Sequence, residues 1–115
     1  MIGKGNNKMK VKNLNGTSEN NPSPVCNCKN WLDHWENNRV WSDGKKYRAV
    51  RCRGCNKDFD HDQLNGAHVI KVGSTDQNHY IIPLCDSCHG KKDAEYEVNA
   101  IDLVSANCST CKNKK

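Results

Sequence analysis

Two cysteine pairs of identical spacing constrain this chain more than any other feature. Cys52 and Cys55 enclose two residues, as do Cys85 and Cys88, and thirty positions separate Cys55 from Cys85. Each pair can supply two thiolates from one tight turn, and two such pairs supply the four ligands of a tetrahedral zinc site. We therefore expect these four cysteines to bind one structural zinc ion.

The composition also indicates that the fold depends on a metal. Only 35% of the 115 residues are hydrophobic and 6% are aromatic, and the mean hydropathy is -0.95. A small domain with so little apolar material usually needs a metal or disulfides for stability. No apolar secretory segment follows Met1, and no apolar run approaches the roughly 20 residues that span a bilayer. We expect a cytoplasmic protein with thiolates on metal, the alternative being a disulfide scaffold.

The remaining four cysteines form two outer pairs, Cys26 with Cys28 and Cys108 with Cys111. Together they predict a second four-thiolate zinc site that brings the two ends of the domain together, because metal binding free energy becomes folding free energy. Two alternatives stay open. One is a mixed thiolate and imidazole site that uses His34, and the other is free thiols.

Charge and composition divide the chain into a domain and two tails. Residues 1–24 are rich in Asn, Gly, Ser and Lys and predict a flexible tail, in which residues 9–14 alternate enough for an edge strand. Residues 25–111 form the expected zinc-binding domain, and residues 112–115 are a basic tail. The net charge of +5 suits nucleic acid as a partner. The alternative is that the basic tails only promote solubility.

The pattern of apolar residues predicts a small α+β domain with a short flanking helix and flanking strands. Asn30 is a plausible N-cap for a helix whose Trp31, Leu32 and Trp35 share one face. We expect these tryptophans and Trp41 to be core residues, the alternative being stacking on bases. Strands are predicted over residues 47–51, 67–72, 80–84 and 101–106, with a loop at residues 73–78 joining the middle two as a hairpin.

The order of these elements defines the expected architecture. A cysteine turn at residues 52–55 is followed by the hairpin and then by a helix that begins at the second pair and continues through Lys91 and Lys92. A turn that gives two ligands, a hairpin, and a helix whose first turn gives the other two is the treble-clef arrangement. We attribute Gly54 to a left-handed turn that directs backbone amides at sulfur.

From Cys52 to Lys92 the sequence resembles the His-Asn-His (HNH) endonuclease family, whose ββα-metal core is often built on a four-cysteine treble clef. Residues 84–89, Leu-Cys-Asp-Ser-Cys-His, are the most specific part of the resemblance. The resemblance implies that His68 is the general base for attack of water on phosphorus. It implies that His89 is a ligand of one catalytic Mg²⁺, Mn²⁺ or Ni²⁺ ion.

Two positions depart from the family pattern. Ala67 stands where active members usually carry Asp or His as a second metal ligand, and Tyr80 stands where the family has its Asn. A shifted register would bring Asn78 or His79 to the second position. Other residues that might replace the missing ligand are Asp60, His61, Asp76 and His79.

Three functions therefore stay open. The first is a metal-dependent endonuclease that hydrolyses phosphodiesters with His68 and His89. The second is a catalytically inactive zinc module that binds nucleic acid or protein, which Ala67 and Tyr80 favour. The third is an interaction protein for which the positive charge is incidental.

Overall fold

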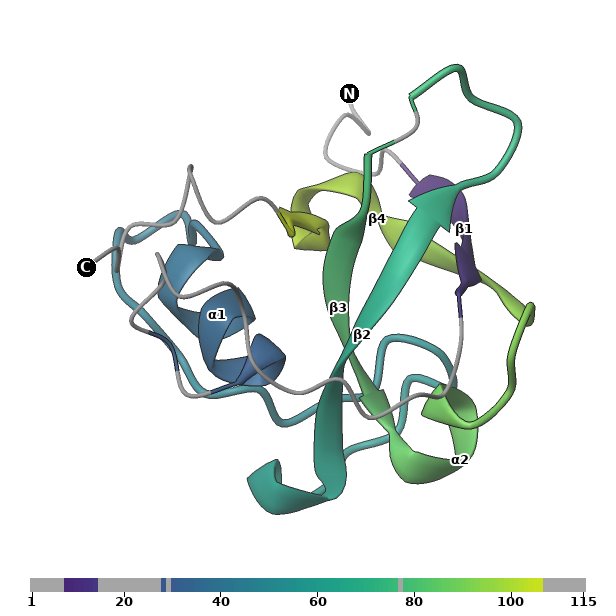
Figure 1. The fold of residues 1–115 in the computed structure, drawn as a ribbon. Helices are drawn as coiled ribbons and strands as arrows, with labels where there is room; N and C mark the ends of the chain where they lie inside the picture. Colours follow the sequence, from purple (N-terminus) through teal and green to yellow (C-terminus); the bar gives the residue numbers. More distant parts are fainter. Residues whose placement is uncertain (1–7, 15–27, 29, 77, 107–115) are drawn as a thin grey trace.

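A five-stranded antiparallel sheet in the order β4–β1–β2–β3–β5 forms the centre of the computed structural model, which describes residues 8–14, 28, 30–76 and 78–106 (Figure 1). Its strands are β1 (Lys8–Asn13), β2 (Leu64–Lys71), β3 (Tyr80–Cys85), β4 (Glu95–Asn99) and β5 (Val104–Ser105). The helical elements are α1 (Trp31–Asn38), α2 (Asp86–His89) and the single 3-10 turns η1 (His61–Gln63) and η2 (Ala100–Asp102). The α+β class is thus confirmed.

The hairpin of β2 and β3 is the part of the fold that the sequence predicts best. The strands pair in the register Gly66 with Pro83 and His68 with Ile81. Pro83 is tolerated inside β3 because β5 pairs only with Tyr80 and Ile81. In the part of β3 that β5 does not pair with, the carbonyl of Pro83 accepts a hydrogen bond of 2.9 Å from the backbone N–H of Arg53. This bond joins the first cysteine turn to the hairpin.

Helix α1 begins where the sequence predicts and packs on β2 and β3 (Figure 1). The side-chain oxygen of Asn30 accepts a 2.8 Å hydrogen bond from the backbone N–H of Asp33, as expected of an N-cap. The helix lies so close to β2 that a Cβ on Gly66 would stand 2.4 Å from the backbone nitrogen of Leu32. Gly66 is therefore required by the close approach of the two elements.

The prediction that the tryptophans belong to the core is confirmed. Trp35 is fully buried, and Trp31 and Trp41 are partly buried against the same apolar cluster. The largest fully buried apolar side chains beside Trp35 come from the three central strands: Val11, Val69, Ile81, Ile82 and Leu84. The core thus lies between α1, the sheet and the cysteine cluster.

The N-terminal strand is present, but its expected place at the sheet edge is wrong. β1 lies between β4 and β2, and Val11 and Asn13 are fully buried. The segment assigned to a tail over residues 1–24 therefore contains an interior strand. Its neighbour β4 was not predicted, although its alternation of Glu95, Tyr96, Glu97 and Val98 is the signal of a half-buried strand.

Three other expected elements are wrong or shorter than predicted. Residues 47–51 form no strand, and only Arg51 makes an isolated bridge, with Asp58. The strand expected at 101–106 is reduced to part of η2 and the two residues of β5. Helix α2 ends at His89, before Lys91 and Lys92. After it the chain turns, with Asp93 in a left-handed conformation at φ of 67°, and residues from 95 onward pair with β1.

A buried ion network ties together three separate parts of the chain. The carboxylate of Asp102 in η2 accepts hydrogen bonds from Nε of Arg39, at 2.8 Å, and from Nε of Arg53, at 3.0 Å. Arg39 caps the end of α1, and Arg53 lies in the first cysteine turn. The backbone carbonyl of Asp102 also accepts a 2.8 Å bond from the indole N–H of Trp35. Both arginines are distant from Asp102 in the sequence.

Candidate metal centre

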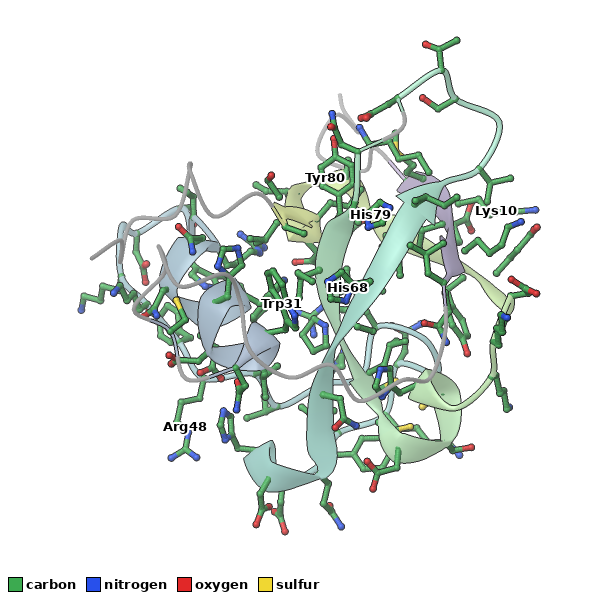
Figure 2. All side chains as sticks on the ribbon, viewed as in Figure 1. Lys10, Trp31, Arg48, His68, His79 and Tyr80 are labelled. Carbon is green, nitrogen blue, oxygen red and sulfur yellow. The ribbon has the colours of Figure 1, made fainter. Side chains whose placement is uncertain are left out.

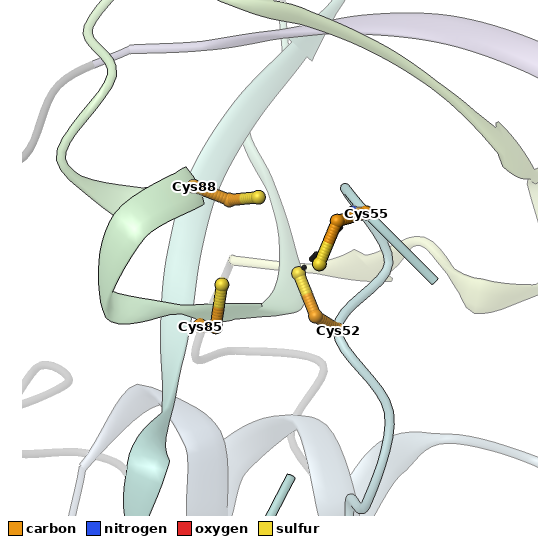
Figure 3. A group of neighbouring side chains, drawn as sticks. All are labelled: Cys52, Cys55, Cys85 and Cys88. Carbon is orange, nitrogen blue, oxygen red and sulfur yellow. Dashed lines mark hydrogen bonds between the residues drawn. The ribbon is translucent and has the colours of Figure 1, made fainter. Parts of the chain in front are cut away.

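The four inner cysteines converge at one point, as their spacing predicts (Figure 3). Cys52 and Cys55 come from the turn before the hairpin, Cys85 ends β3, and Cys88 lies in α2. Their Sγ atoms all lie within 4.8 Å of one another. Ligands at about 2.3 Å from a tetrahedral zinc ion are about 3.8 Å apart, so a small contraction would complete the site. The group can hold a metal ion such as zinc.

The electrostatics of the four thiols favour a cation between them. Burial raises the pKa of Cys52, but backbone N–H groups of Cys55, Cys85 and Gly54 outweigh burial and lower this pKa to about 7. Burial and the adjacent sulfur of Cys52 raise the pKa of Cys88 to about 12. One thiolate therefore opposes ionisation of the next, and a divalent cation removes this conflict.

The first cysteine turn owes its shape to two residues with different roles. Asn56, with φ of 62°, takes the left-handed conformation that the sequence analysis assigned to Gly54. Gly54 is instead favoured by the limited space, because a Cβ there would lie 3.0 Å from the sulfur of Cys88 and 3.0 Å from the ring of Tyr96. The sequence prediction named the right residue for the wrong reason.

Two residues outside the resemblance hold the second cysteine turn in place. The buried side-chain amide of Asn13 donates to the carbonyl oxygens of His89 and Lys91, at 2.9 and 3.0 Å. The hydroxyl of Tyr96 donates to the carbonyl of Cys88 at 2.9 Å. The bond to His89 pairs a carbonyl at the end of α2, whereas the carbonyls of Lys91 and Cys88 already accept from backbone N–H groups and gain a second donor. The sequence gives no local signal for either role, because both partners are distant along the chain.

The two histidines of the family pattern are both partly buried. His68 stands in β2 with its ring edge-on to Trp31, at a centroid distance of 4.7 Å, and 6.2 Å from the ring of His79 (Figure 2). Burial lowers the pKa of His68, and the charges of His79, His89 and His34 lower it further. Burial also lowers the pKa of His89, at the end of α2. Both rings are therefore biased toward their neutral forms.

The residues considered as replacements for the missing ligand do not converge on these histidines. Tyr80 donates a 2.6 Å hydrogen bond to Asp76, which also binds Lys71 at 2.9 Å. His61 lies 2.6 Å from a carboxylate oxygen of Glu36. Ala67, which stands at the position of the missing ligand, is fully buried and has no side-chain donor atom. Of these candidates, His79 alone forms a ring contact with His68.

Within the described ranges, the four inner cysteines form the one group of three or more His, Cys, Asp or Glu donors close enough to share an ion. Three of the outer cysteines, Cys26, Cys108 and Cys111, fall outside these ranges. Cys28 is described, and its sulfur lies 4.0 Å from Nδ1 of His34.

A basic hollow of about 270 Å³ lies next to the first cysteine turn. Its charged lining residues are the cations Lys8, Arg39, Arg51 and Arg53 and the anions Glu97 and Asp102. Trp41 and Asn99 also line it, and the Trp41 indole nitrogen and the Asn99 side-chain oxygen have no hydrogen-bond partner among the described residues. The hollow thus has a positive charge balance, and two of the residues that line it each carry a buried polar atom without a partner among the described residues.

Comparisons with known proteins do not assign a family. The chain matches no protein-family model, no curated protein and no solved structure. In the described part of the chain, no helix has the length and apolar character needed to cross a membrane.

Proposed function

We propose that this protein is a zinc-stabilised, HNH-like domain of the treble-clef type that binds nucleic acid. The order of cysteine turn, hairpin and short helix around four converging sulfurs supports the architecture. The observation that carries the binding proposal is the basic hollow. It gathers Lys8 from β1, Arg39 from the end of α1, and Arg51 and Arg53 from the cysteine turn region.

The chemistry of the hollow matches a phosphodiester backbone. Guanidinium groups bind phosphate through paired N–H donors, and contacts of this kind supply most of the affinity of proteins for nucleic acids. Asp102 neutralises part of the charge of Arg39 and Arg53. Lys8 and Arg51 lie at the exposed rim, where the ion pair of Arg51 with Asp58 is exposed to solvent and therefore weak. The rim cations are the residues that a phosphate would meet first.

Fluorescence anisotropy with labelled single-stranded and duplex DNA and RNA, measured across a series of salt concentrations, tests this proposal. Each of Lys8→Gln and Arg51→Gln is expected to weaken binding and to reduce the slope of log affinity against log salt by about one. Arg48→Gln is the matched control, since Arg48 is exposed and does not line the hollow. The proposal is contradicted if the protein shows no salt-dependent binding, or if Arg48→Gln weakens binding as much as Lys8→Gln and Arg51→Gln do.

Hydrolysis of the bound strand is the second candidate function. It is favoured by His68, whose pKa is lowered by burial and by the charges of His79, His89 and His34, so that its ring is neutral and can accept a proton. In this mechanism His68 takes the proton of the water that attacks phosphorus. His89 would hold a divalent cation, which supplies Lewis-acid stabilisation of the leaving 3′ oxygen.

The described residues fit that cation poorly. Apart from the cysteines, they bring no three donors together, so His89 would need phosphate oxygens of the substrate as further ligands. This is why binding stands first and hydrolysis second.

A plasmid-nicking assay with Mg²⁺, Mn²⁺ or Ni²⁺ distinguishes the two functions. If the domain hydrolyses DNA, His68→Ala is expected to abolish nicking while zinc content and DNA affinity stay unchanged. His61→Ala is the control, because His61 pairs with Glu36 away from His68. No nicking by the unmodified protein, at concentrations where DNA is saturated, would falsify hydrolysis and leave the binding module.

A further inference from the structure

Cys28 and His34 form a contact with the geometry of two ligands on one ion. The Cys28 sulfur lies 4.0 Å from Nδ1 of His34. In a tetrahedral zinc site, a thiolate at about 2.3 Å and an imidazole nitrogen at about 2.0 Å are separated by about 3.6 Å. The observed distance is close to this value. His34 is fully buried in α1, so its ring is held in place.

The other ring nitrogen of His34 has the partner typical of a ligating histidine. Nε2 lies 2.8 Å from the backbone carbonyl oxygen of Ser105. A carbonyl only accepts hydrogen bonds, so Nε2 carries the hydrogen and Nδ1 of the neutral ring presents its lone pair toward Cys28. Histidine ligands of metals usually donate their second N–H in this way, which fixes both tautomer and orientation.

The sulfur of Cys28 also has a supporting donor. The side-chain amide of Asn37, one helical turn after His34, donates to it at 3.3 Å. The inner cysteine cluster has the same feature, since the backbone N–H of Gly54 donates to the Cys52 sulfur at 3.3 Å. Donors of this kind stabilise a thiolate, which is the ligating form of cysteine.

We propose that Cys28 and His34 bind a second zinc ion, separate from the four-cysteine centre. Thiolate and neutral imidazole together select zinc over hard cations such as Mg²⁺. Through Ser105 in β5, this ion would fasten the segment before α1 to the C-terminal edge of the sheet. The inference does not depend on the proposed function, because it concerns neither nucleic-acid binding nor hydrolysis.

A tetrahedral ion needs two more donors, and the sequence restricts where they come from. Cys26 is two positions before Cys28, while Cys108 and Cys111 are three and six positions after Ser105. All three lie outside the described residues. The structural evidence rests on Cys28, His34, Asn37 and Ser105, and the experiment identifies the remaining donors.

Elemental analysis of the reduced, full-length protein provides the first test. The unmodified chain is expected to bind two zinc ions, whereas His34→Gln and Cys28→Ser each bind one. His61→Gln is the matched control and is expected to retain two. Separate Cys26→Ser, Cys108→Ser and Cys111→Ser variants then show which cysteines complete the site, each true ligand costing one ion. One zinc ion per unmodified chain, or two in His34→Gln, overturns the proposal.

Cadmium-113 NMR of the unmodified protein keeps the test decisive if a variant fails to fold. Two resonances are expected, one characteristic of four thiolates and one shifted by imidazole coordination, with coupling from the second cadmium to His34. A plain hydrogen bond between thiol and imidazole would leave only the four-thiolate resonance, which contradicts the inference.

Discussion

At the scale of single residues, small and polar side chains constrain this fold as strongly as the large apolar ones. Gly66 is required because a Cβ there would collide with the backbone of α1, and Gly54 is favoured because a Cβ there would crowd the side chains around it. Asn13 is buried so that its amide can hold the turn that carries Cys88 and His89. His68 is half-buried between Trp31 and His79, and this environment sets its protonation state.

We expect Gly66→Ala to destabilise the protein by about 3 kcal/mol, since the new Cβ would lie within 2.4 Å of backbone atoms that can move only with α1. Urea denaturation followed by tryptophan fluorescence measures the change. Gly90→Ala is the control, because its Cβ would meet its nearest atom at 3.4 Å. Equal midpoints for the two variants would show that α1 shifts freely on β2.

The environment of His68 predicts an acid-sensitive contribution to stability. Burial, followed by the charges of His79, His89 and His34, lowers the pKa of His68 in the folded state below its ordinary value of 6.5. As the pH falls below 6.5, His68 becomes protonated in the unfolded chain while it is still neutral in the folded chain. Proton binding therefore favours the unfolded state, and the free energy of unfolding decreases. The contribution of His68 to stability is fully present above pH 6.5, and it is lost as the pH falls from 6.5 to the lowered pKa of the folded state.

Denaturation of the unmodified protein and of His68→Gln, compared from about pH 8 to about pH 5, measures that contribution. The variant is expected to lose less stability on acidification, because its amide does not titrate. Parallel pH profiles for the two proteins would mean that His68 titrates alike in the folded and unfolded chains.

At the scale of elements, short segments here are stabilised by tertiary contacts more than by their own propensity. Helix α2 has only four residues, and an isolated helix of that length is not stable in water. The turn at residues 52–55, the end of α1 and η2 are joined mainly by the bonds of Asp102 to Arg39 and Arg53. Each element therefore depends on partners far away in the sequence.

Asp102→Asn is expected to cost about 3–5 kcal/mol, because it leaves two largely buried guanidinium groups without their counter-ion. The exposed pair of Arg51 and Asp58 provides the control, and Asp58→Asn should cost less than about 1 kcal/mol. The free energy of unfolding of both variants, measured by urea denaturation, tests this prediction. If Asp102→Asn lowers it no more than Asp58→Asn does, solvent reaches the arginines of the network.

At the scale of the whole molecule, a metal ion held by the four inner cysteines would replace part of the apolar core that the composition lacks. The core residues of the sheet surround one side of the cysteine cluster, and Cys52, Cys85 and Cys88 are themselves members of the core. A structural zinc ion contributes about 10 kcal/mol in small domains, which is comparable to the total stability of a domain of this size.

Removal of zinc by a strong chelator under reducing conditions is therefore expected to unfold the domain, with loss of near-ultraviolet circular dichroism from the buried tryptophans. Adding zinc back should restore the signal, and chelator already saturated with zinc should have no effect. A metal-free chain that keeps its tertiary spectrum and its cooperative unfolding would show that the apolar core suffices.

The sequence by itself determined the features that depend on local spacing. The cysteine pairs predicted one four-sulfur cluster, Asn30 predicted the start of α1, and the β-branched and aromatic runs predicted the central hairpin. These signals are readable because ligand spacing, capping and alternation act over a few neighbouring residues.

Only the tertiary structure decided what depends on contacts between distant residues. It placed β1 inside the sheet, stopped α2 at His89, and brought Asp102 to two arginines. No local pattern encodes such pairings, because the partners are chosen by packing, by the pairing of neighbouring strands and by the need to satisfy buried polar groups.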